Sequence, residues 1–312
     1  MQETLAALFA IEVGFRGELS NHLHLIFRTR PDVVESWSDK DVVRRWLTIT
    51  KLAKSQDGQP KPPSKARMAM ERVLPGRVKQ IRENLSNPSW FMGILSEYIG
   101  RRSNREDDCT GHFWEDRFDC RELADEAAIL VCGIYVDLNQ IRAGEAPTPE
   151  TSTHTSAYDR ILDRAARLAQ REPPAKIPPG QGEIDHQSAA GWLCELTLDE
   201  SVSVNSVAMR QSASGRRATD KGILPITLDD YLKLLDASGR VVQQGKSGSI
   251  PDHLAPIIER LGIKRNMWTE LVTDFDSLFG RVVGKPSTVA KRATDAGRRW
   301  FRGVSNCADA FG

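Results

Sequence analysis

Residues 20–27, with the sequence SNHLHLIF, alternate between polar and apolar positions with a period of two, which predicts a β-strand. The side chains at positions 23, 25 and 27 form an apolar face of that strand. His22 and His24 lie on the opposite face together with Ile26. Each imidazole has two nitrogens to satisfy, and a divalent metal bound by both rings is one economical solution. The simpler alternative is one hydrogen-bonded core histidine and a second histidine at the rim.

Apolar positions at helical spacing predict helices over most of the remaining chain. Residues 3–13 are predicted to form a first helix, which ends at a turn marked by Gly14 and Gly17. Residues 111–118, GHFWEDRF, are rich in aromatic side chains and predict a short strand. Further helices are predicted from Ser38 onward, on both sides of Pro75 and Gly76, and over residues 88–105, 123–138, 157–170, 227–236, 253–261, 267–279 and 287–302.

Proline and glycine divide the chain into parts. Residues 171–188 contain four prolines and two glycines, which is typical of a linker. We therefore predict an N-terminal α+β domain at residues 1–165, a linker at 166–190 and a mostly helical C-terminal extension at 191–312. The extension ends in a basic stretch, residues 281–302, that fits a nucleic-acid contact and a solvated basic face equally well.

The overall composition is that of a soluble globular protein, with 40% hydrophobic and 27% charged residues. The net charge of +1 favours no particular partner. The five cysteines are widely spaced without a Cys-x-x-Cys pair, which argues against a zinc knuckle or a disulfide framework and fits a reducing cytoplasm. The first residues lack the pattern of a signal peptide, and no apolar run approaches the ~18 residues that would suggest a membrane span. We expect a cytoplasmic protein without a membrane partner.

A second candidate group lies at the end of the helix predicted at 123–138. Tyr135 and Asn139 are four residues apart and share a helix face. With His22 and His24, the Asn139 oxygen would make a mixed nitrogen and oxygen site, which suits Mg²⁺ or Mn²⁺, and the imidazoles favour Mn²⁺. A tyrosine hydroxyl is a poor nucleophile at neutral pH, but beside a metal-bound phosphate it could attack in line. The product would be a phosphotyrosine and a free DNA 3′-hydroxyl, a step that can be reversed without ATP.

At these residues the chain resembles a known family. SNHLHLIF is similar to the His-hydrophobic-His strand of the HUH nucleases, and GHFWEDRF and IYVDLNQIRAG are similar to later motifs of the single-tyrosine HUH transposases, in the insertion-sequence-type and REP-associated branch. The resemblance covers residues 1 to about 165. It implies a ferredoxin-like or RRM-like small antiparallel sheet flanked by helices. It also implies Tyr135 as nucleophile, His22, His24 and Asn139 as ligands of Mg²⁺ or Mn²⁺, hairpin-forming single-stranded DNA as partner, and a possible homodimer.

Three features depart from this pattern. The family's first strand, expected well before His22, is missing, so the reading frame could be truncated or mis-started. Gln140 stands where the family has proline, which would let the helix run on and move Arg142. His24 and Tyr135 are 111 positions apart, more than in compact members.

Arginines near these motifs are candidates for DNA contacts. Arg101, Arg102 and Arg105 gather at the end of the helix predicted at 88–105, beside a tyrosine. They could grip a phosphate backbone, although cations also suit a solvated helix C-terminus. Arg117 and Arg142 flank the candidate site in the sequence and are predicted to contact phosphate.

The leading hypothesis is therefore a transposase-like DNA strand transferase, and the main alternative is a catalytically inactive, truncated or domesticated DNA-binding protein of the same family. A replication initiator or relaxase is less favoured, because the chain contains no G-x-x-x-x-G-K-[ST] motif. A helical protein with His22 and His24 in its core is the least favoured. Asp137, within the key helix, is expected to be exposed rather than catalytic.

Overall fold

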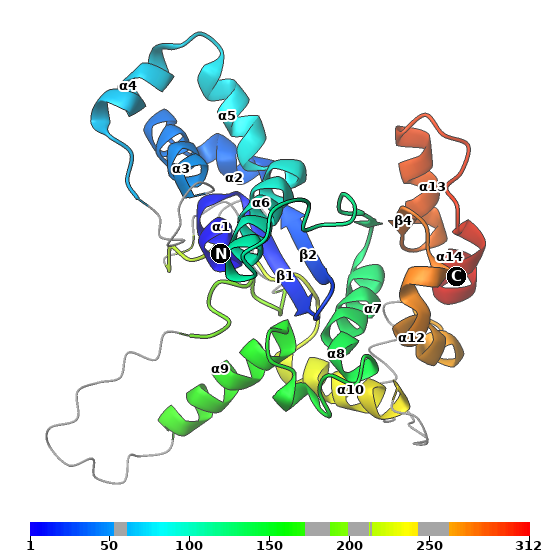
Figure 1. The fold of residues 1–312 in the computed structure, drawn as a ribbon. Helices are drawn as coiled ribbons and strands as arrows, with labels where there is room; N and C mark the ends of the chain where they lie inside the picture. The colour runs from blue at the N-terminus through cyan, green and yellow to red at the C-terminus, as the bar shows by residue number, and fades with distance from the viewer. Residues whose placement is uncertain (53–60, 172–187, 199–211, 213, 243–261) are drawn as a thin grey trace, which may run out of the picture.

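The computed structural model describes residues 1–52, 61–171, 188–198, 212, 214–242 and 262–312. It is an α+β structure whose larger sheet is the antiparallel hairpin of β1 (Ile11–Glu18) and β2 (Leu23–Thr29). Gly17 pairs with His24 and Val13 with Phe27, and the register shifts between Val13 and Phe15. In the described part of the chain, this sheet has no third strand. Helices lie on both of its sides (Figure 1).

The predicted helix at 3–13 is wrong in its second half. Helix α1 (Gln2–Leu8) ends before β1 begins. Ile11, Val13 and Phe15 are fully buried in the strand, and their alternate spacing with a period of two fits the pairing with β2. The predicted turn glycines lie inside the strand. A Cβ on Gly17 would stand 2.8 Å from the backbone oxygen of Val136. Glycine at this position therefore allows the helix that contains Val136 to pack closely against the strand, and it does not form a turn.

One side of the hairpin faces an all-helical N-terminal layer. The apolar side chains at positions 23, 25 and 27 pack against a cluster built mainly by α1, α3, α5 and α6. The predictions of a helix from Ser38, of two helices around Pro75 and Gly76, and of a helix over 88–105 are confirmed. The helices of this layer are α2 (Pro31–Ser36), α3 (Asp39–Leu52), α4 (Lys65–Val73), α5 (Arg77–Leu85) and α6 (Pro88–Glu106).

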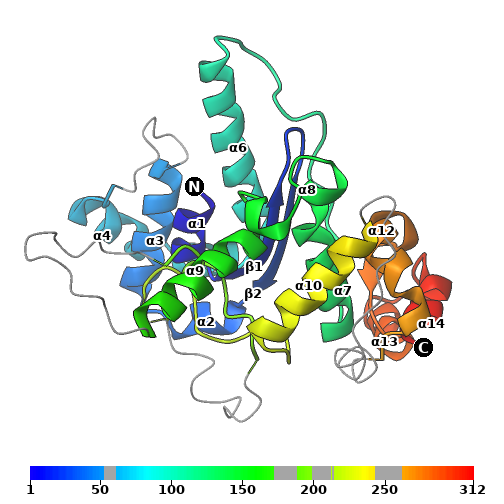
Figure 2. The same ribbon diagram turned by 90° about the horizontal axis from the view of Figure 1, so that it is seen from below.

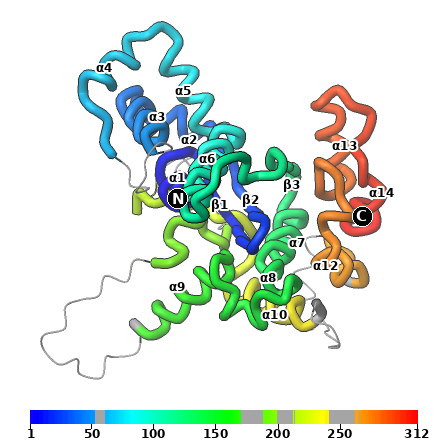
Figure 3. Tube along the Cα trace, in the orientation of Figure 1, coloured from blue at the N-terminus to red at the C-terminus, as the bar shows by residue number. Residues whose placement is uncertain are grey.

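The other side of the hairpin faces helix α7 and, beyond it, the C-terminal helices (Figure 3). A second hydrophobic cluster runs from Phe15 and Ile26 through α7 into these helices. A short parallel pair of strands, β3 (Glu122–Leu123) and β4 (Val282–Val283), joins the same two parts. In Figure 2, α10 runs beside α7. The helices on this side are α7 (Glu126–Asp137), α8 (Asn139–Arg142), α9 (Ser156–Arg171), α10 (Leu228–Val242), α12 (Trp268–Leu278), α13 (Pro286–Asp295) and α14 (Val304–Phe311).

Two further predictions require correction. Residues 111–118 form no strand, because Trp114 donates its ring N–H to the Ser96 carbonyl oxygen at 2.9 Å and holds this loop on α6. The helix predicted at 287–302 ends at Asp295, shortly before Gly297 adopts a left-handed φ of 64°. Helices α9, α10 and α12 confirm the other predictions, whereas the predicted helix at 253–261 and most of the predicted linker lie outside the described residues.

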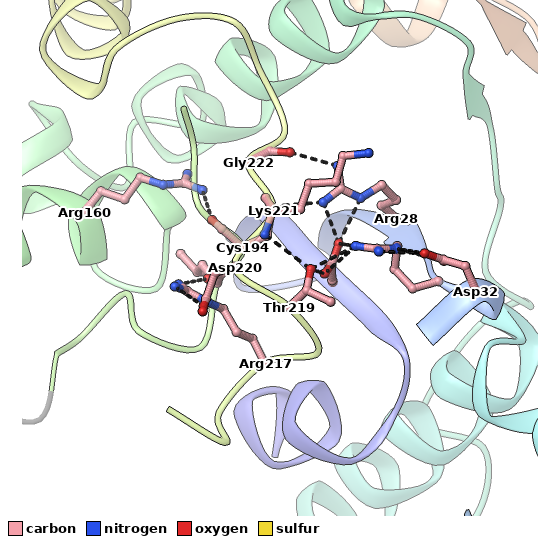
Figure 4. Close-up of polar contacts among 12 residues, drawn as sticks. Arg28, Asp32, Arg160, Cys194, Arg217, Thr219, Asp220, Lys221 and Gly222 are labelled. Carbon is pink, nitrogen blue, oxygen red and sulfur yellow. Dashed lines mark hydrogen bonds and ion pairs between the residues drawn. The ribbon is translucent and has the colours of Figure 1, made fainter. Parts of the chain in front are cut away.

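A buried ionic network ties the segment around Thr219 to the hairpin (Figure 4). Glu12 is fully buried and pairs with Arg28 at 2.5 Å and with Arg30 at 3.1 Å. Thr219 donates its hydroxyl to the same carboxylate, and Arg28 donates to the Lys221 carbonyl oxygen at 3.0 Å. Chain from beyond residue 200 is therefore part of the folded unit around the sheet. Within the described residues, no helix has the length and apolar character needed to cross a membrane.

Candidate active site

The two histidines of the β2 segment lie side by side, as their spacing predicts. His22 immediately precedes β2 and is exposed, whereas His24 is within the strand and half-buried. Their ring centroids are 4.9 Å apart and the rings are nearly perpendicular. The pair therefore lies at the solvent-facing end of the hairpin rather than deep in the core.

Tyr135 projects from α7 toward the same end of the hairpin. Its ring centroid is 5.8 Å from that of His24 and 5.7 Å from that of Phe275 on α12. Tyr135 is 9% exposed, so little more than one edge of the ring can be reached from solvent. Helix α7 and strand β2 thus bring together two residues that are 111 positions apart in the sequence.

Asn139 and Arg142 of α8 complete the arrangement. The Asn139 amide nitrogen lies 3.0 Å from His22 Nε2, and its oxygen accepts a hydrogen bond from Arg142 at 2.5 Å. The Arg142 guanidinium carbon lies 3.6 Å from the centroid of the Tyr135 ring, and the same group donates to the Thr273 carbonyl oxygen at 2.8 Å. Arg142 is therefore packed into the site instead of extending into solvent.

These contacts determine how well the site fits a divalent metal. His22 Nδ1 lies 2.6 Å from the Asn21 side-chain oxygen, an acceptor, a contact that favours the tautomer with its proton on Nδ1 and its lone pair on Nε2. The Asn139 amide N–H meets that lone pair where a cation would bind. The Asn139 oxygen faces the Arg142 guanidinium, which opposes an amide flip. The two imidazoles thus fit a metal, but Asn139 must rotate before its oxygen can serve as a ligand.

No group of three or more His, Cys, Asp or Glu side chains placed to hold a metal lies within the described residues. A metal at this site would therefore be held by His22 and His24, with amide, substrate or water oxygens in its other positions. Burial lowers the pKa of His24, an effect that the nearby Asp276 carboxylate partly opposes. The lower pKa favours the neutral imidazole, which is the form that binds metal.

Asp276 of α12 is a site residue that the sequence did not reveal. Tyr135 donates its hydroxyl to Asp276 Oδ2 at 2.7 Å. Arg121 donates to the other carboxylate oxygen at 3.1 Å and to the Asp276 backbone oxygen at 3.0 Å. Burial raises the pKa of Tyr135, and the hydrogen bond to Asp276 raises it further, so the hydroxyl is protonated at neutral pH. Asp276 is 141 positions from Tyr135, and no local motif marks it.

The other predicted DNA-contacting arginines lie outside this group. Arg101 pairs with Glu97 at 2.6 Å and Arg102 with Glu106 at 2.7 Å, both along the exposed surface of α6. Arg105 donates to the Arg101 carbonyl oxygen at 3.3 Å. Arg117 is exposed, in the loop that follows α6. Of the five predicted arginines, the structure brings only Arg142 into contact with Tyr135.

Asp137 and Gln140 have structural roles that differ from the predictions. Asp137 is fully buried rather than exposed, and it accepts hydrogen bonds from Ser156 Oγ at 2.5 Å and from Tyr231 at 2.6 Å. Gln140 donates to the backbone oxygens of Glu18 at 2.7 Å and Thr153 at 2.6 Å. Helix α7 ends at Asp137, and helical structure resumes in α8, which passes through Gln140 and ends at Arg142.

Taken together, a tyrosine hydroxyl, two neighbouring imidazoles, an amide, a guanidinium and a carboxylate lie at one end of the hairpin. Side chains of these kinds are those that enzymes use to bind anions and to carry out nucleophilic chemistry. No family model, curated protein or solved structure matches this chain.

Proposed function

We propose that this protein is a DNA strand transferase of the single-tyrosine HUH transposase type, with Tyr135 as its nucleophile. The observation that carries the proposal is the convergence of the motif residues. His24 and Tyr135 have ring centroids 5.8 Å apart, and Asn139 contacts His22 at 3.0 Å. Local secondary structure alone cannot bring these segments together. We also propose that the β1–β2 hairpin corresponds to part of an HUH-type, ferredoxin-like sheet.

The proposed reaction is an in-line displacement at phosphorus. The Tyr135 hydroxyl oxygen attacks a phosphodiester of single-stranded DNA, and the 3′-oxygen leaves. The new phosphotyrosine keeps the energy of the broken bond, so a 3′-hydroxyl can attack it later and complete a strand transfer. Arg142, whose guanidinium lies 3.6 Å from the Tyr135 ring centroid, brings positive charge to the place where an anionic substrate must approach.

His22 and His24 would hold Mg²⁺ or Mn²⁺, with the rotated amide of Asn139 as the candidate third ligand. Bound there, the ion would act as a Lewis acid on a non-bridging phosphate oxygen. Hairpin-forming single-stranded DNA is the proposed substrate, and a homodimer is the proposed assembly. Arg101, Arg102, Arg105 and Arg117 remain candidates for contacts with DNA outside the reacting phosphate.

A second candidate function is DNA binding without catalysis. Two observations favour it: the Asn139 oxygen is engaged by Arg142, and the Tyr135 hydroxyl is engaged by Asp276. In such a protein, both groups would stay in these structural contacts when DNA binds.

The decisive experiment is a cleavage assay with hairpin-bearing oligonucleotides taken from the flanks of the protein's own gene, with and without Mn²⁺. We expect a covalent protein–DNA band that requires both Mn²⁺ and Tyr135, and that is lost in Tyr135→Phe. Tyr158→Phe is the matched control, because this half-buried tyrosine lies on α9, and it should keep the band. DNA binding without a covalent band under any condition would favour the second function.

Metal binding can be measured separately from cleavage. A ligand that binds only the folded state stabilises it by ~2.7 kcal/mol at 100 times its dissociation constant. We expect Mn²⁺ to raise the melting temperature of the unaltered protein and of Tyr135→Phe, but not of His24→Ala. The exposed His112→Ala serves as the control and should respond like the unaltered protein. No stabilisation of the unaltered protein at saturating Mn²⁺ would contradict the ligand assignment.

A further inference from the structure

The Tyr135 hydroxyl donates to one carboxylate, and that carboxylate comes from the C-terminal part of the chain. The distance from Tyr135 Oη to Asp276 Oδ2 is 2.7 Å, within the range over which a general base abstracts a proton. Within the described part of the chain, no other group accepts a hydrogen bond from this hydroxyl. Any reaction that makes Tyr135 a nucleophile must remove this proton, and Asp276 is the group in place to take it.

Arg121 holds the carboxylate in that position. It donates from one guanidinium nitrogen both to Asp276 Oδ1 at 3.1 Å and to the Asp276 backbone oxygen at 3.0 Å. Oδ2 is thereby directed toward Tyr135. A nucleophile, a base within hydrogen-bond reach and a third group that orients the base form the usual arrangement of an activated nucleophile.

The surroundings of the pair also suit this role. Phe275, the neighbour of Asp276 on α12, packs against the Tyr135 ring with centroids 5.7 Å apart and fixes the ring relative to the carboxylate. The Asp276 side chain remains 48% exposed, so the carboxylate end of the pair is open to solvent. Arg142 lies against the face of the Tyr135 ring, where its positive charge favours the build-up of negative charge on the phenolate.

We propose that Asp276 is the general base that activates Tyr135. The inference rests on the proposed strand-transfer function for the identity of the substrate. As the Tyr135 oxygen bonds to phosphorus, its proton passes to Asp276 Oδ2, the bond from phosphorus to the 3′-oxygen breaks, and the departing 3′-oxygen takes a proton from water. In the reverse step, a 3′-hydroxyl attacks the phosphotyrosine and passes its proton to water, the bond from phosphorus to the Tyr135 oxygen breaks, and Asp276 gives a proton to the leaving phenolate. The C-terminal extension therefore supplies part of the catalytic site.

The first test compares single-turnover rates of covalent adduct formation on DNA. Asp276→Asn keeps the size and a hydrogen-bond acceptor but removes the basicity, and we expect the rate to fall by ~10²-fold or more. Asp276→Glu should recover part of that loss. Asp274→Asn is the matched control, an exposed aspartate two residues away on the same helix, and it should react at the unaltered rate. A rate for Asp276→Asn equal to or above that of the unaltered protein would overturn the proposal and identify Asp276 as a restraint on Tyr135.

Chemical rescue separates a base from a merely structural contact. In Asp276→Ala, added formate should restore adduct formation in a concentration-dependent way, whereas neutral formamide should not. A carboxylate needed only for packing would not be replaced by formate in solution. Equal effects of formate and formamide would therefore count against a proton-accepting role.

A second readout does not depend on DNA. An aryl sulfonyl fluoride reacts with a tyrosine through formation of an oxygen–sulfur bond and loss of fluoride, and the phenolic proton again needs an acceptor. We expect labelling of Tyr135, located by peptide mapping, to slow about tenfold or more in Asp276→Asn. If labelling follows this pattern while no oligonucleotide gives an adduct, the proposed strand-transfer function is rejected, and the role of Asp276 as the base for Tyr135 is supported. Equal labelling of both proteins, or no labelling of Tyr135 in the unaltered protein, would overturn the role of Asp276.

Discussion

The two sides of the β1–β2 hairpin differ in what holds them together. On the side of the N-terminal helices, contacts are mainly apolar, with Phe91 of α6 packed against Phe9 at a ring-centroid distance of 5.4 Å and against Phe27 at 6.0 Å. On the side of α7, His24 and Tyr135 lie among amide, guanidinium and carboxylate groups. A single strand, β2, supplies both sides through its alternating side chains.

One face of β2 therefore contributes mainly to the stability of the fold, and the other face carries the residues of the candidate active site. The apolar side gains free energy from the burial of surface, which any well-fitting hydrophobic residue can provide. The α7 side also buries apolar surface, but the groups around His24 and Tyr135 depend on individual hydrogen bonds of defined direction, and each lost partner leaves another group unsatisfied. Substitutions on the two sides should therefore have different effects: a lost apolar contact lowers the free energy of unfolding, and a lost polar partner also disturbs the groups around Tyr135.

The largest effect is expected on the apolar side. Phe91 is fully buried, and Phe91→Ala should lower the free energy of unfolding by ~3–5 kcal/mol, since it removes apolar contacts and leaves a cavity. Urea titration measures the change. Trp300→Ala is the control, because this side chain is 67% exposed, and it should stay within ~0.5 kcal/mol of the unaltered protein. A loss below ~1 kcal/mol for Phe91→Ala would mean that this layer contributes little to the core.

Gln140 provides a smaller effect on the polar side. Gln140→Ala removes both donors to the backbone oxygens of Glu18 and Thr153, and we expect a loss of ~1–3 kcal/mol in the free energy of unfolding. The exposed Gln80→Ala should change it by less than ~0.5 kcal/mol. Equal effects of the two substitutions in urea titrations would show that the hydrogen bond from Gln140 of α8 to β1 does not stabilise the fold.

Arg142 tests whether the guanidinium shape matters beyond its charge. Arg142→Lys keeps the charge but cannot reproduce the forked contacts to Asn139 and Thr273, so we expect a loss of about 1 kcal/mol. Arg101→Lys, on the exposed surface of α6, should be neutral within ~0.5 kcal/mol. Thermal unfolding of both variants measures this difference. An unchanged unfolding midpoint for Arg142→Lys would contradict the expected loss of stability.

The smallest effect is a pH dependence from His24. Its folded-state pKa lies below the unfolded value, so between these two values the unfolded chain binds more protons. The free energy of unfolding should therefore fall as the pH drops below ~6.5, the ordinary pKa of histidine. We expect His24→Gln to flatten this part of the profile when metal is chelated, while the exposed His112→Gln leaves it unchanged. Identical profiles for His24→Gln and the unaltered protein would remove His24 as the source.

Helices were the most predictable part of the fold. The helices over 88–105 and 157–170 were predicted within a few residues because they are long and begin at recognisable caps or prolines. The strand at 11–18 was missed because Gly14 and Gly17 within it were interpreted as a turn, although Ile11, Val13 and Phe15 alternate with a period of two. Its strand conformation depends on pairing with β2, which local sequence does not reveal.

The sequence by itself determined the two-faced character of β2 and the spacing of Tyr135, Asn139 and Arg142, because side-chain direction along a strand or helix follows from local backbone geometry. Only the tertiary structure decided which remote groups meet them. Asp276 reaches Tyr135 from 141 positions away, and Asp137 becomes buried because α9 and α10 cover it. Such contacts depend on how whole helices pack together, and a short stretch of sequence carries no record of that packing.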